Sequence, residues 1–291
     1  MKSLGLAKAF RVKDGDGFRL ESIDPGDTRG IKSKAQAAAG LARGVQRLAA
    51  LQEKLYADDH WAVLVILQAM DAAGKDSTIE HVMSGVNPQG TQVFTFKAPS
   101  PEELDHDFLW RTTRCLPERG RIGIFNRSYY EEVLVVRVHP EFLGKQRLPA
   151  GLVKRDVWRQ RFESITAHER HLVRNGTLVL KFFLHVSRDE QRRRLLARLD
   201  EPAKNWKFNA DDLGERDRWD EYMAAYEDTI RHTATRHAPW YVVPSDHKWF
   251  TRLVVVDAMV EALEGLDLAF PVMPAEQRKA MQAARAALER E

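Results

Sequence analysis

Cysteine is almost absent from the chain, since Cys115 is the only one in 291 residues. A single cysteine excludes an internal disulfide framework and is typical of a protein from a reducing compartment. The residues that flank Cys115 form no recognised nucleophile motif. We therefore assign Cys115 a structural role and expect neither disulfides nor a cysteine nucleophile.

Long hydrophobic runs are also missing. Charged residues interrupt the first 20 positions before an apolar stretch of signal-peptide length can form. No run approaches the roughly 18 apolar residues that a membrane-spanning helix requires. We therefore expect a cytoplasmic protein with no membrane partner.

Neither sign of charge dominates, with 45 basic and 42 acidic residues and a net charge of +3. So small an excess gives no reason to expect a nucleic-acid partner, and an anionic ligand must be met by local clusters of cations. Zinc-binding spacings of Cys and His, the HExxH motif and the G-x-S-x-G motif do not occur either. These absences argue against a zinc site and against a serine nucleophile of the G-x-S-x-G type.

Internal repeats, low-complexity tracts and long Pro- or Gly-rich linkers are absent, which favours a single domain over residues 1–291. Five short segments rich in Val, Ile, Leu and Phe alternate with longer patterns of helical spacing. This order predicts an α/β fold with a doubly wound, five-stranded parallel sheet, which binds ligands at the carboxyl ends of its strands. The strands are expected at 61–68, 91–97, 121–126, 177–186 and 240–243.

The rest of the chain divides around this core. An amphipathic stretch at 32–57 precedes the first strand and predicts a helix within an N-terminal helical extension at 1–58. The core is expected at 59–270, followed by a polar terminal helix at 271–291. The highly charged and poorly apolar region 187–214 is a candidate for a mobile flap.

The segment 61–78, WAVLVILQAMDAAGKDST, carries the strongest functional signal. A strand, a loop of small residues and Lys75 at a helix start form a phosphate-binding cradle of backbone N–H groups and a mobile positive charge. The match to G-x-x-x-x-G-K-[ST] is imperfect, because Ala69 and Asp76 occupy its first and last positions. Asp71, inside the loop, is the candidate metal ligand. The alternative is an ordinary turn with an exposed lysine.

A second polar cluster follows the strand expected at 121–126. The neighbouring strand end of a phosphate-loop fold normally offers an acidic residue toward the metal, and Asn126 stands in that place here. The guanidinium of Arg127 can bind phosphoryl oxygens and keeps its charge throughout turnover. Spacing alone equally allows Arg127 to pair with Glu131 or Glu132.

A third cluster is a run of basic residues in the region 187–214. Arg188 and Arg192 are four positions apart and share a helix face, as do Arg194 and Arg198, so they form a strip suited to successive phosphates. Several acidic residues within the run partly neutralise it. An ordinary solvated helix surface is therefore the alternative.

Several segments together resemble the family-2 polyphosphate kinases, and most strongly the single-domain class that phosphorylates nucleoside monophosphates. The likeness covers residues from about 32 to 270. It implies a three-layer αβα phosphate-loop kinase fold, similar to thymidylate kinase, with a helical lid at about 187–214. The segments are AMDAAGKDST at 69–78, HVMSGVNPQG at 81–90, IFNRSYYEEVLVVRVHP at 124–140, NWKFNADDLGERDRWDEY at 205–222 and YVVPSDHKWF at 241–250.

The resemblance also implies roles by position. Asp71, Lys75 and Arg127 match the catalytic positions, with Asp71 as the metal ligand, and Asn126, Arg127 and Glu131 match the nucleotide side. Glu131 falls where another class has Asn, so we expect it to help select the nucleotide. The implied polyphosphate-binding residues are Ala72, Ala73, Gly74, Lys75, Asp76, Ser77, Arg188, Arg192 and Arg193.

The implied reaction is reversible transfer of a terminal phosphoryl group from inorganic polyphosphate to AMP or ADP, giving ADP or ATP, with Mg²⁺ or Mn²⁺ and in a dimer or tetramer of the chain. Two alternatives stay open. An ATP-dependent nucleotide or small-molecule kinase is expected to carry a Lys-Ser/Thr pair, which Lys75 and Asp76 do not form. A non-catalytic polyphosphate-binding protein would keep the basic strip without needing Asp71.

Overall fold

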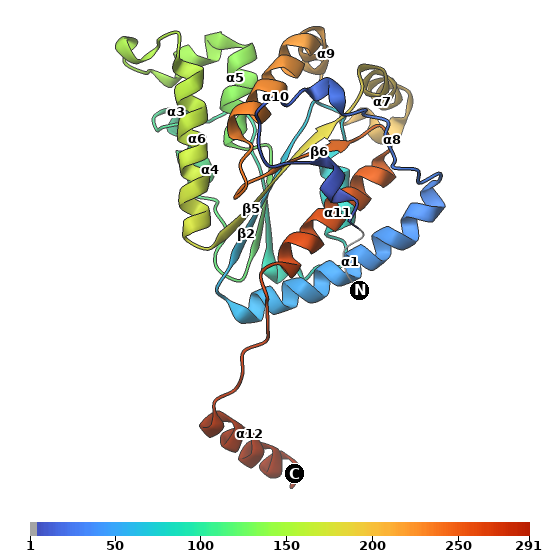
Figure 1. Cartoon of the computed structure of the whole chain (residues 1–291), viewed down its shortest axis with the longest axis vertical. Coiled ribbons are helices and arrows are strands. Elements are labelled where there is room, and N and C mark those ends of the chain that lie inside the picture. Colours follow the sequence, from blue (N-terminus) through green and yellow to red (C-terminus); the bar gives the residue numbers. More distant parts are fainter. Residues whose placement is uncertain (1–4) are drawn as a thin grey trace.

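The computed structural model describes residues 5–291, and over this range the strands form one six-stranded sheet in the order β1-β6-β5-β2-β4-β3 (Figure 1). The five predicted strands are present, and all pairs between them are parallel, as expected. Their bounds are β2 Ala62–Gln68, β3 Thr91–Thr95, β4 Ile122–Asn126, β5 Thr177–His185 and β6 Trp240–Pro244.

The prediction of a purely parallel, five-stranded sheet is wrong at one edge. β1 (Arg11–Val12) pairs antiparallel with β6, so the sheet is mixed. A strand of two half-buried residues is too short to produce a readable periodicity, and it forms because the open edge of β6 is available for pairing.

Burial explains why the central strands could be predicted from the sequence. Every residue of β2 and β4 is buried, whereas the edge strand β3 has exposed and half-buried positions. Strands covered on both faces need continuously apolar sequences, and this composition was visible in the sequence.

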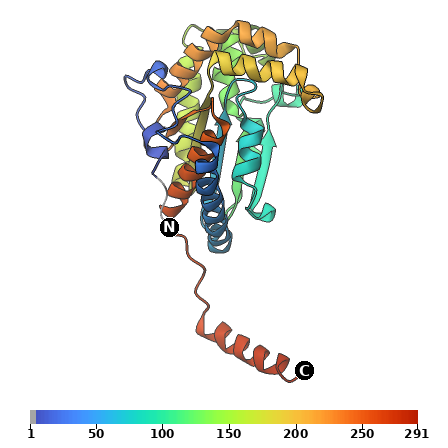
Figure 2. The same cartoon turned by 90° about the vertical axis from the view of Figure 1, so that its right-hand side faces the viewer.

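Helices cover both sides of the sheet, which confirms the three-layer αβα architecture (Figures 1 and 2). On one side α1 (Lys34–Asp58) packs on α11 (Lys248–Glu264), which also contacts α2 (Lys75–Val82). On the other, α6 (Val157–Arg174) packs against β5 and α10 (Trp219–Thr233).

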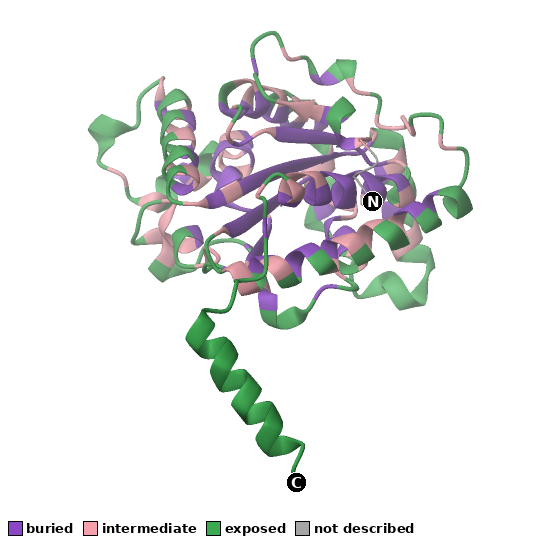
Figure 3. Ribbon diagram, turned by 60° about the horizontal axis from the view of Figure 1, so that its bottom comes forward, coloured by how far each residue is buried: buried purple, intermediate pink, exposed green. Residues whose placement is uncertain are grey.

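The expected flap region consists of helices α7, α8 and α9, which lie beyond the carboxyl ends of the strands (Figure 1). The predicted helices at the start and end of the chain are α1 and α12. α12 stands apart from the body, and its residues are exposed (Figure 3). Among the helices of residues 5–291, none is both long and apolar enough to cross a membrane.

Short elements fill the connections. The helices among them are α3 Pro101–Leu104, α4 Trp110–Thr113, α5 Val135–Val138, α7 Arg188–Asp200, α8 Pro202–Asn205, α9 Asp211–Asp217 and α12 Ala275–Leu288. The 3-10 turns are η1 Ala7–Phe10, η2 Leu20–Ser22, η3 Pro88–Gly90, η4 Tyr129–Val133, η5 Pro140–Gln146 and η6 Ala150–Leu152.

The strand register brings the ends of the parallel strands together at one edge. Leu67 of β2 aligns with Asn126 of β4, and Gln68 aligns with Phe183 of β5. Because all five strands run the same way, the segments that follow them emerge side by side. The candidate site is assembled from these segments.

Candidate functional site

The loop after β2 has the backbone of a cradle. Ala72 and Gly74 adopt left-handed conformations, with φ of 60° and 110°. Such values are favourable for glycine and strained for alanine, and strained residues cluster at ligand-binding sites. Gly74 is the N-cap of α2, so the free N–H groups of the first helical turn and the positive end of the helix dipole face the loop.

Lys75 is buried beneath this loop, with 9 % of its surface exposed. Its Nζ donates a hydrogen bond of 2.8 Å to the carbonyl of Ala69, across the loop from its own backbone. Burial, reinforced by the positive charge of Arg127, lowers the pKa of Lys75 to about 8, although Asp71, Glu131 and Asp76 act in the opposite direction. A bound anion near Nζ would favour the charged form again.

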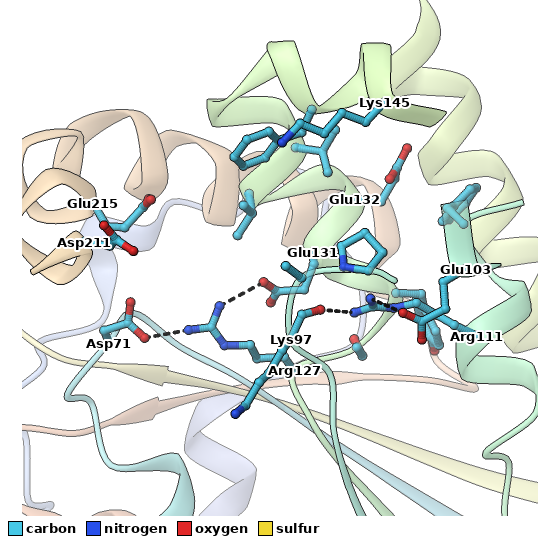
Figure 4. Close-up of a pocket in the computed structure, with 18 of the residues that line it drawn as sticks. Asp71, Lys97, Glu103, Arg111, Arg127, Glu131, Glu132, Lys145, Asp211 and Glu215 are labelled. Atoms are coloured by element: carbon cyan, nitrogen blue, oxygen red, sulfur yellow. Dashed lines mark hydrogen bonds and ion pairs between the residues drawn. The ribbon is translucent and has the colours of Figure 1, made fainter. Parts of the chain in front are cut away.

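Arg127 connects this loop to the next strand. Its φ of 64° is left-handed, and its N–H donates to the carbonyl of Leu67 at 3.0 Å. Figure 4 shows its guanidinium between two carboxylates, those of Asp71 at 2.6 Å and Glu131 at 3.3 Å. The carboxylate of Glu131 raises the pKa of Arg127, burial lowers it, and the carboxylate of Asp71 raises it. The net effect raises the pKa of Arg127, so its guanidinium stays charged.

Glu131 and Glu132 point to different partners, which decides between the two pairings that spacing allowed. Glu131 accepts hydrogen bonds from Arg127 and from Nε2 of Gln68 at 2.8 Å. Glu132 instead pairs with Arg161 at 2.9 Å. Glu131 is therefore the partner of Arg127, and it lines the same cavity as Asp71.

Asn126 is buried between the two loops, and its Nδ2 donates to Oδ1 of Asp76 at 2.7 Å. Its own Oδ1 is buried and has no hydrogen-bond partner within residues 5–291. A buried oxygen without a partner costs free energy unless a donor or a cation reaches it. This amide is therefore a candidate contact for a ligand group.

The arginines of α7 lie on different faces of the helix, so some are exposed and one is buried. Arg188, Arg192 and Arg193 are exposed, and Arg193 pairs with Glu190 at 2.6 Å. Among the described residues, none of the three forms a hydrogen bond to the phosphate loop. The structure does not bring these predicted polyphosphate ligands into contact with Asp71 or Lys75.

Arg194 contacts the loop in their place. The sequence places Arg194 in the basic strip with Arg198 but does not predict that it contacts the phosphate loop. Arg194 is 7 % exposed and donates from Nη1 to the carbonyls of Ala72 at 3.1 Å and Ala73 at 2.7 Å. Gln191, one turn earlier, donates to the carbonyl of Asp71 at 3.0 Å. The signal available in the sequence was the spacing of Gln191, Arg194 and Leu195, which marks the inward face of α7.

A cavity of about 440 Å³ opens on the Asp71 side of the loop. In Figure 4, Asp211 and Glu215 reach in from α9 opposite Asp71, and Lys97 lies below Arg127. Lys97, Asp212, Tyr222 and Tyr226 also line it and were not identified as site residues from the sequence, because they belong to segments that the fold brings together from distant positions. A volume of this size is typical of a small-molecule site.

A comparison with known families agrees with this geometry. Residues 31–271 match the family described as Polyphosphate kinase 2. The chain belongs to the polyphosphate kinase 2 family. The resemblance inferred from the loop and strand-end motifs is therefore confirmed.

Relatives in this family match nearly the whole chain. The ADP-polyphosphate phosphotransferase of Rhodopseudomonas palustris is 52% identical over 94% of this chain and 96% of its own length. The AMP/ADP-polyphosphate phosphotransferase of Meiothermus ruber is 48% identical over 91% of this chain and 95% of its own. The crystal structure of polyphosphate kinase 2 from Arthrobacter aurescens superposes with a TM-score of 0.86 at 41% identity, covering 96% of each chain.

The polyphosphate kinase 2 site offers oxygen ligands for a divalent cation. Within residues 5–291, no group of three or more His, Cys, Asp and Glu side chains forms a closed metal site. Mg²⁺ seldom needs one, because it is usually held by one or two carboxylates, water and substrate phosphates. The Asp71 carboxylate is one candidate ligand of this kind. The carboxylate of Asp76 and the Oδ1 atom of Asn126, two residues joined by a hydrogen bond, are further candidates.

Proposed function

We propose that the chain transfers the terminal phosphoryl group of inorganic polyphosphate to AMP and ADP, in a reversible reaction. The observation that carries this proposal is the position of Arg127, which joins the phosphate loop at Asp71 to the cavity at Glu131. A phosphoryl group at this junction has the loop on one side and room for a nucleotide on the other. The names of the two bacterial relatives support polyphosphate and AMP or ADP as substrates.

The proposed roles follow from charge. Lys75 and Arg127 hold the oxygens of the phosphoryl group that is transferred, and Ala72, Ala73, Gly74, Asp76 and Ser77 form the surrounding cradle. Asp71 is the proposed ligand of Mg²⁺ or Mn²⁺, which neutralises phosphate charge when it is bound. The accepting phosphate oxygen is already anionic, so the side chains align the reactants and need not supply a strong base.

The acceptor is proposed to lie in the cavity beside Asn126, Arg127 and Glu131. Glu131 is held in place by Gln68 and Arg127, so its carboxylate has a fixed direction. A fixed carboxylate discriminates between nucleotides better than a mobile one, because a mismatched group leaves it unpaired in a partly buried site. Glu131→Asn is therefore expected to change the order of preference among nucleotides more than the KM for polyphosphate.

The exposed arginines Arg188, Arg192 and Arg193 remain proposed polyphosphate contacts on the lid at about 187–214. Their side chains are exposed and can meet a long anion, although Arg193 must first release Glu190 and all three lie away from the loop carbonyls. Arg192→Ala or Arg193→Ala is expected to raise the KM for polyphosphate more than the KM for the nucleotide.

We also propose that residues 1–291 act as one domain, with an extension at 1–58, a core at 59–270 and a terminal helix at 271–291. The chain is proposed to assemble as a dimer or tetramer.

One assay tests the proposed function against its alternatives. The full chain is incubated with Mg²⁺, long-chain polyphosphate and each nucleotide in turn, and products are followed by phosphorus NMR. Formation of ADP and ATP from AMP is the expected result. Activity with ATP as the only donor would favour an ATP-dependent kinase, and polyphosphate binding without turnover would favour a binding protein.

A further inference from the structure

Two cations at the start of α11 form neither a hydrogen bond nor an ion pair within the part of the chain that the structure describes. Lys248 and Arg252 are four positions apart and therefore lie on the same face of the helix. Within residues 5–291, neither side chain has a hydrogen bond or an ion pair, and Nε of Arg252 is buried. Arginine side chains that are partly buried normally have their N–H groups paired, so this pair requires an explanation.

Lys248 lies at the phosphate loop, on the side away from the nucleotide cavity, and Arg252 lies one helical turn further along α11, where it lines a groove with His81. A Cβ atom at Gly74 would lie 3.7 Å from Cε of Lys248 and 3.9 Å from Nη1 of Arg194. The cavity is lined by Ala69, Met70 and Asp71 but not by Gly74. The loop therefore has a nucleotide side and an opposite side that faces α11.

The charge around Lys248 is predominantly positive, whereas burial lowers the pKa of Arg252 and the nearby carboxylate of Glu80 acts in the opposite direction. Burial, followed by the repulsion of Arg194, Arg252 and Lys204, lowers the pKa of Lys248 to about 8, with Glu190 acting in the opposite direction. Arg194 is saturated by the loop carbonyls, by those of Ser245 and Asp246, and by Glu190. Among the described residues, Lys248 and Arg252 have no hydrogen bond or ion pair, whereas Arg194 uses all its N–H groups and Lys204 pairs with Glu201.

We propose that Lys248 and Arg252 bind a phosphate unit of the donor chain behind the unit held by the phosphate loop. The occupant is a linear polyanion of repeating phosphates, because Lys248 meets the loop on the face away from the cavity and Arg252 follows one helical turn further along α11. A mononucleotide acceptor does not reach this subsite. The inference rests on the proposed function, since it assumes polyphosphate as the donor.

The test compares chain lengths. Initial rates of AMP phosphorylation are measured with tripolyphosphate and with long-chain polyphosphate for the full chain and for a Lys248→Met/Arg252→Gln double variant. The double variant is expected to lose roughly tenfold in kcat/KM for the long chain, with a much smaller loss for tripolyphosphate and an unchanged KM for AMP. The salt dependence of kcat/KM for the long chain is also expected to become shallower, because fewer counterions are released.

Controls separate this proposal from other causes. Lys279→Met on the exposed helix α12 removes a positive charge far from the loop and is expected to leave the ratio of rates unchanged. Lys248→Arg with Arg252→Lys retains both charges and is expected to restore most of the long-chain preference. Equilibrium binding of long-chain polyphosphate, measured by calorimetry, gives a readout that does not depend on turnover.

The outcomes distinguish the two proposals. If the unmodified chain shows no polyphosphate-dependent activity, the proposed function fails and this inference fails with it. If the unmodified chain is active but the double variant keeps the same ratio of long-chain to short-chain rates and the same affinity for the long chain, only the Lys248 and Arg252 subsite is refuted.

Discussion

Arg127 donates a hydrogen bond of 2.6 Å to the carboxylate of Asp71, so the ends of two neighbouring strands are joined by an ion pair. Asp71 follows β2 and Arg127 follows β4. The pair fixes the two groups to which we assign the cation and the transferring phosphoryl group. It also means that binding of either ligand must redirect one member of the pair.

The first prediction concerns the planar guanidinium of Arg127, which can contact two oxygens at once. Arg127→Lys keeps the charge but cannot contact two oxygens in one plane, so kcat is expected to fall by roughly 10²-fold. Initial rates at saturating polyphosphate and AMP measure this effect. Arg159→Lys on the exposed side of α6 is the matched control and is expected to leave kcat unchanged. A near-normal kcat for Arg127→Lys would contradict the assigned role.

The second prediction concerns pH. Burial lowers the pKa of Lys75 to about 8, so the ammonium form that binds phosphate is lost as the pH rises through that value. Because kcat/KM reports the free enzyme, kcat/KM for polyphosphate is expected to fall above about pH 8 by about tenfold per pH unit. Bound phosphate favours the charged lysine, so the corresponding fall in kcat lies at higher pH.

Lys248 needs a separate control in this experiment, because its pKa is also lowered to about 8. In Lys248→Arg that position stays charged at all accessible pH values, and the fall in kcat/KM is expected to persist. In Lys75→Arg, the kcat/KM of any remaining activity is expected to stay constant as the pH rises above about 8. The reverse pattern would show that Lys75 is not the group that titrates.

The third prediction separates two adjacent arginines. Arg194→Met leaves loop carbonyls and Glu190 without their donor in a largely buried place, so the free energy of unfolding is expected to drop by roughly 2–4 kcal/mol. Arg193→Met, at the exposed neighbouring position, is expected to change it by less than about 0.5 kcal/mol. Denaturant unfolding measures both values, and equal effects would refute the buried contact.

The sequence predicted the central sheet and the loop well because their signals are local. β2 and β4 are continuously apolar, and the small residues between Ala69 and Lys75 follow directly from a strand. These features need no knowledge of what packs against them. The expected αβα architecture followed from their order along the chain.

Other parts of the site depend on tertiary packing and could not be read in this way. The sequence shows three consecutive arginines but not which of them faces the loop. Arg194 is buried and Arg193 is exposed because of the way in which α7 packs on the loop. Lys248 reaches Gly74 from the far end of the chain. β1 forms only because it finds the edge of β6.

The fourth prediction concerns a fully buried ion pair in the core. Nζ of Lys181 on β5 lies 2.6 Å from Glu169 on α6, and both side chains are completely buried. Lys181→Met leaves the Glu169 charge unpaired, so the free energy of unfolding is expected to drop by roughly 3–5 kcal/mol.

A second substitution tests the reason for this loss. Glu169→Gln in the Lys181→Met background removes the charge but still accepts the hydroxyl hydrogen bonds of Tyr129 and Tyr130. The double variant is therefore expected to unfold at higher denaturant concentration than Lys181→Met alone. If it is less stable, the unpaired charge is not the cause.

Phosphoryl transfer by the Lys75 loop is tested most directly by following the β-phosphate of newly formed ADP by phosphorus NMR, with polyphosphate as the sole donor and AMP as acceptor. The unmodified chain is expected to produce ADP, and Lys75→Ala and Asp71→Asn are expected to lose at least about 10³-fold in rate while circular dichroism shows an intact fold. Near-normal rates in either folded variant would contradict the assignment of the reaction to this loop.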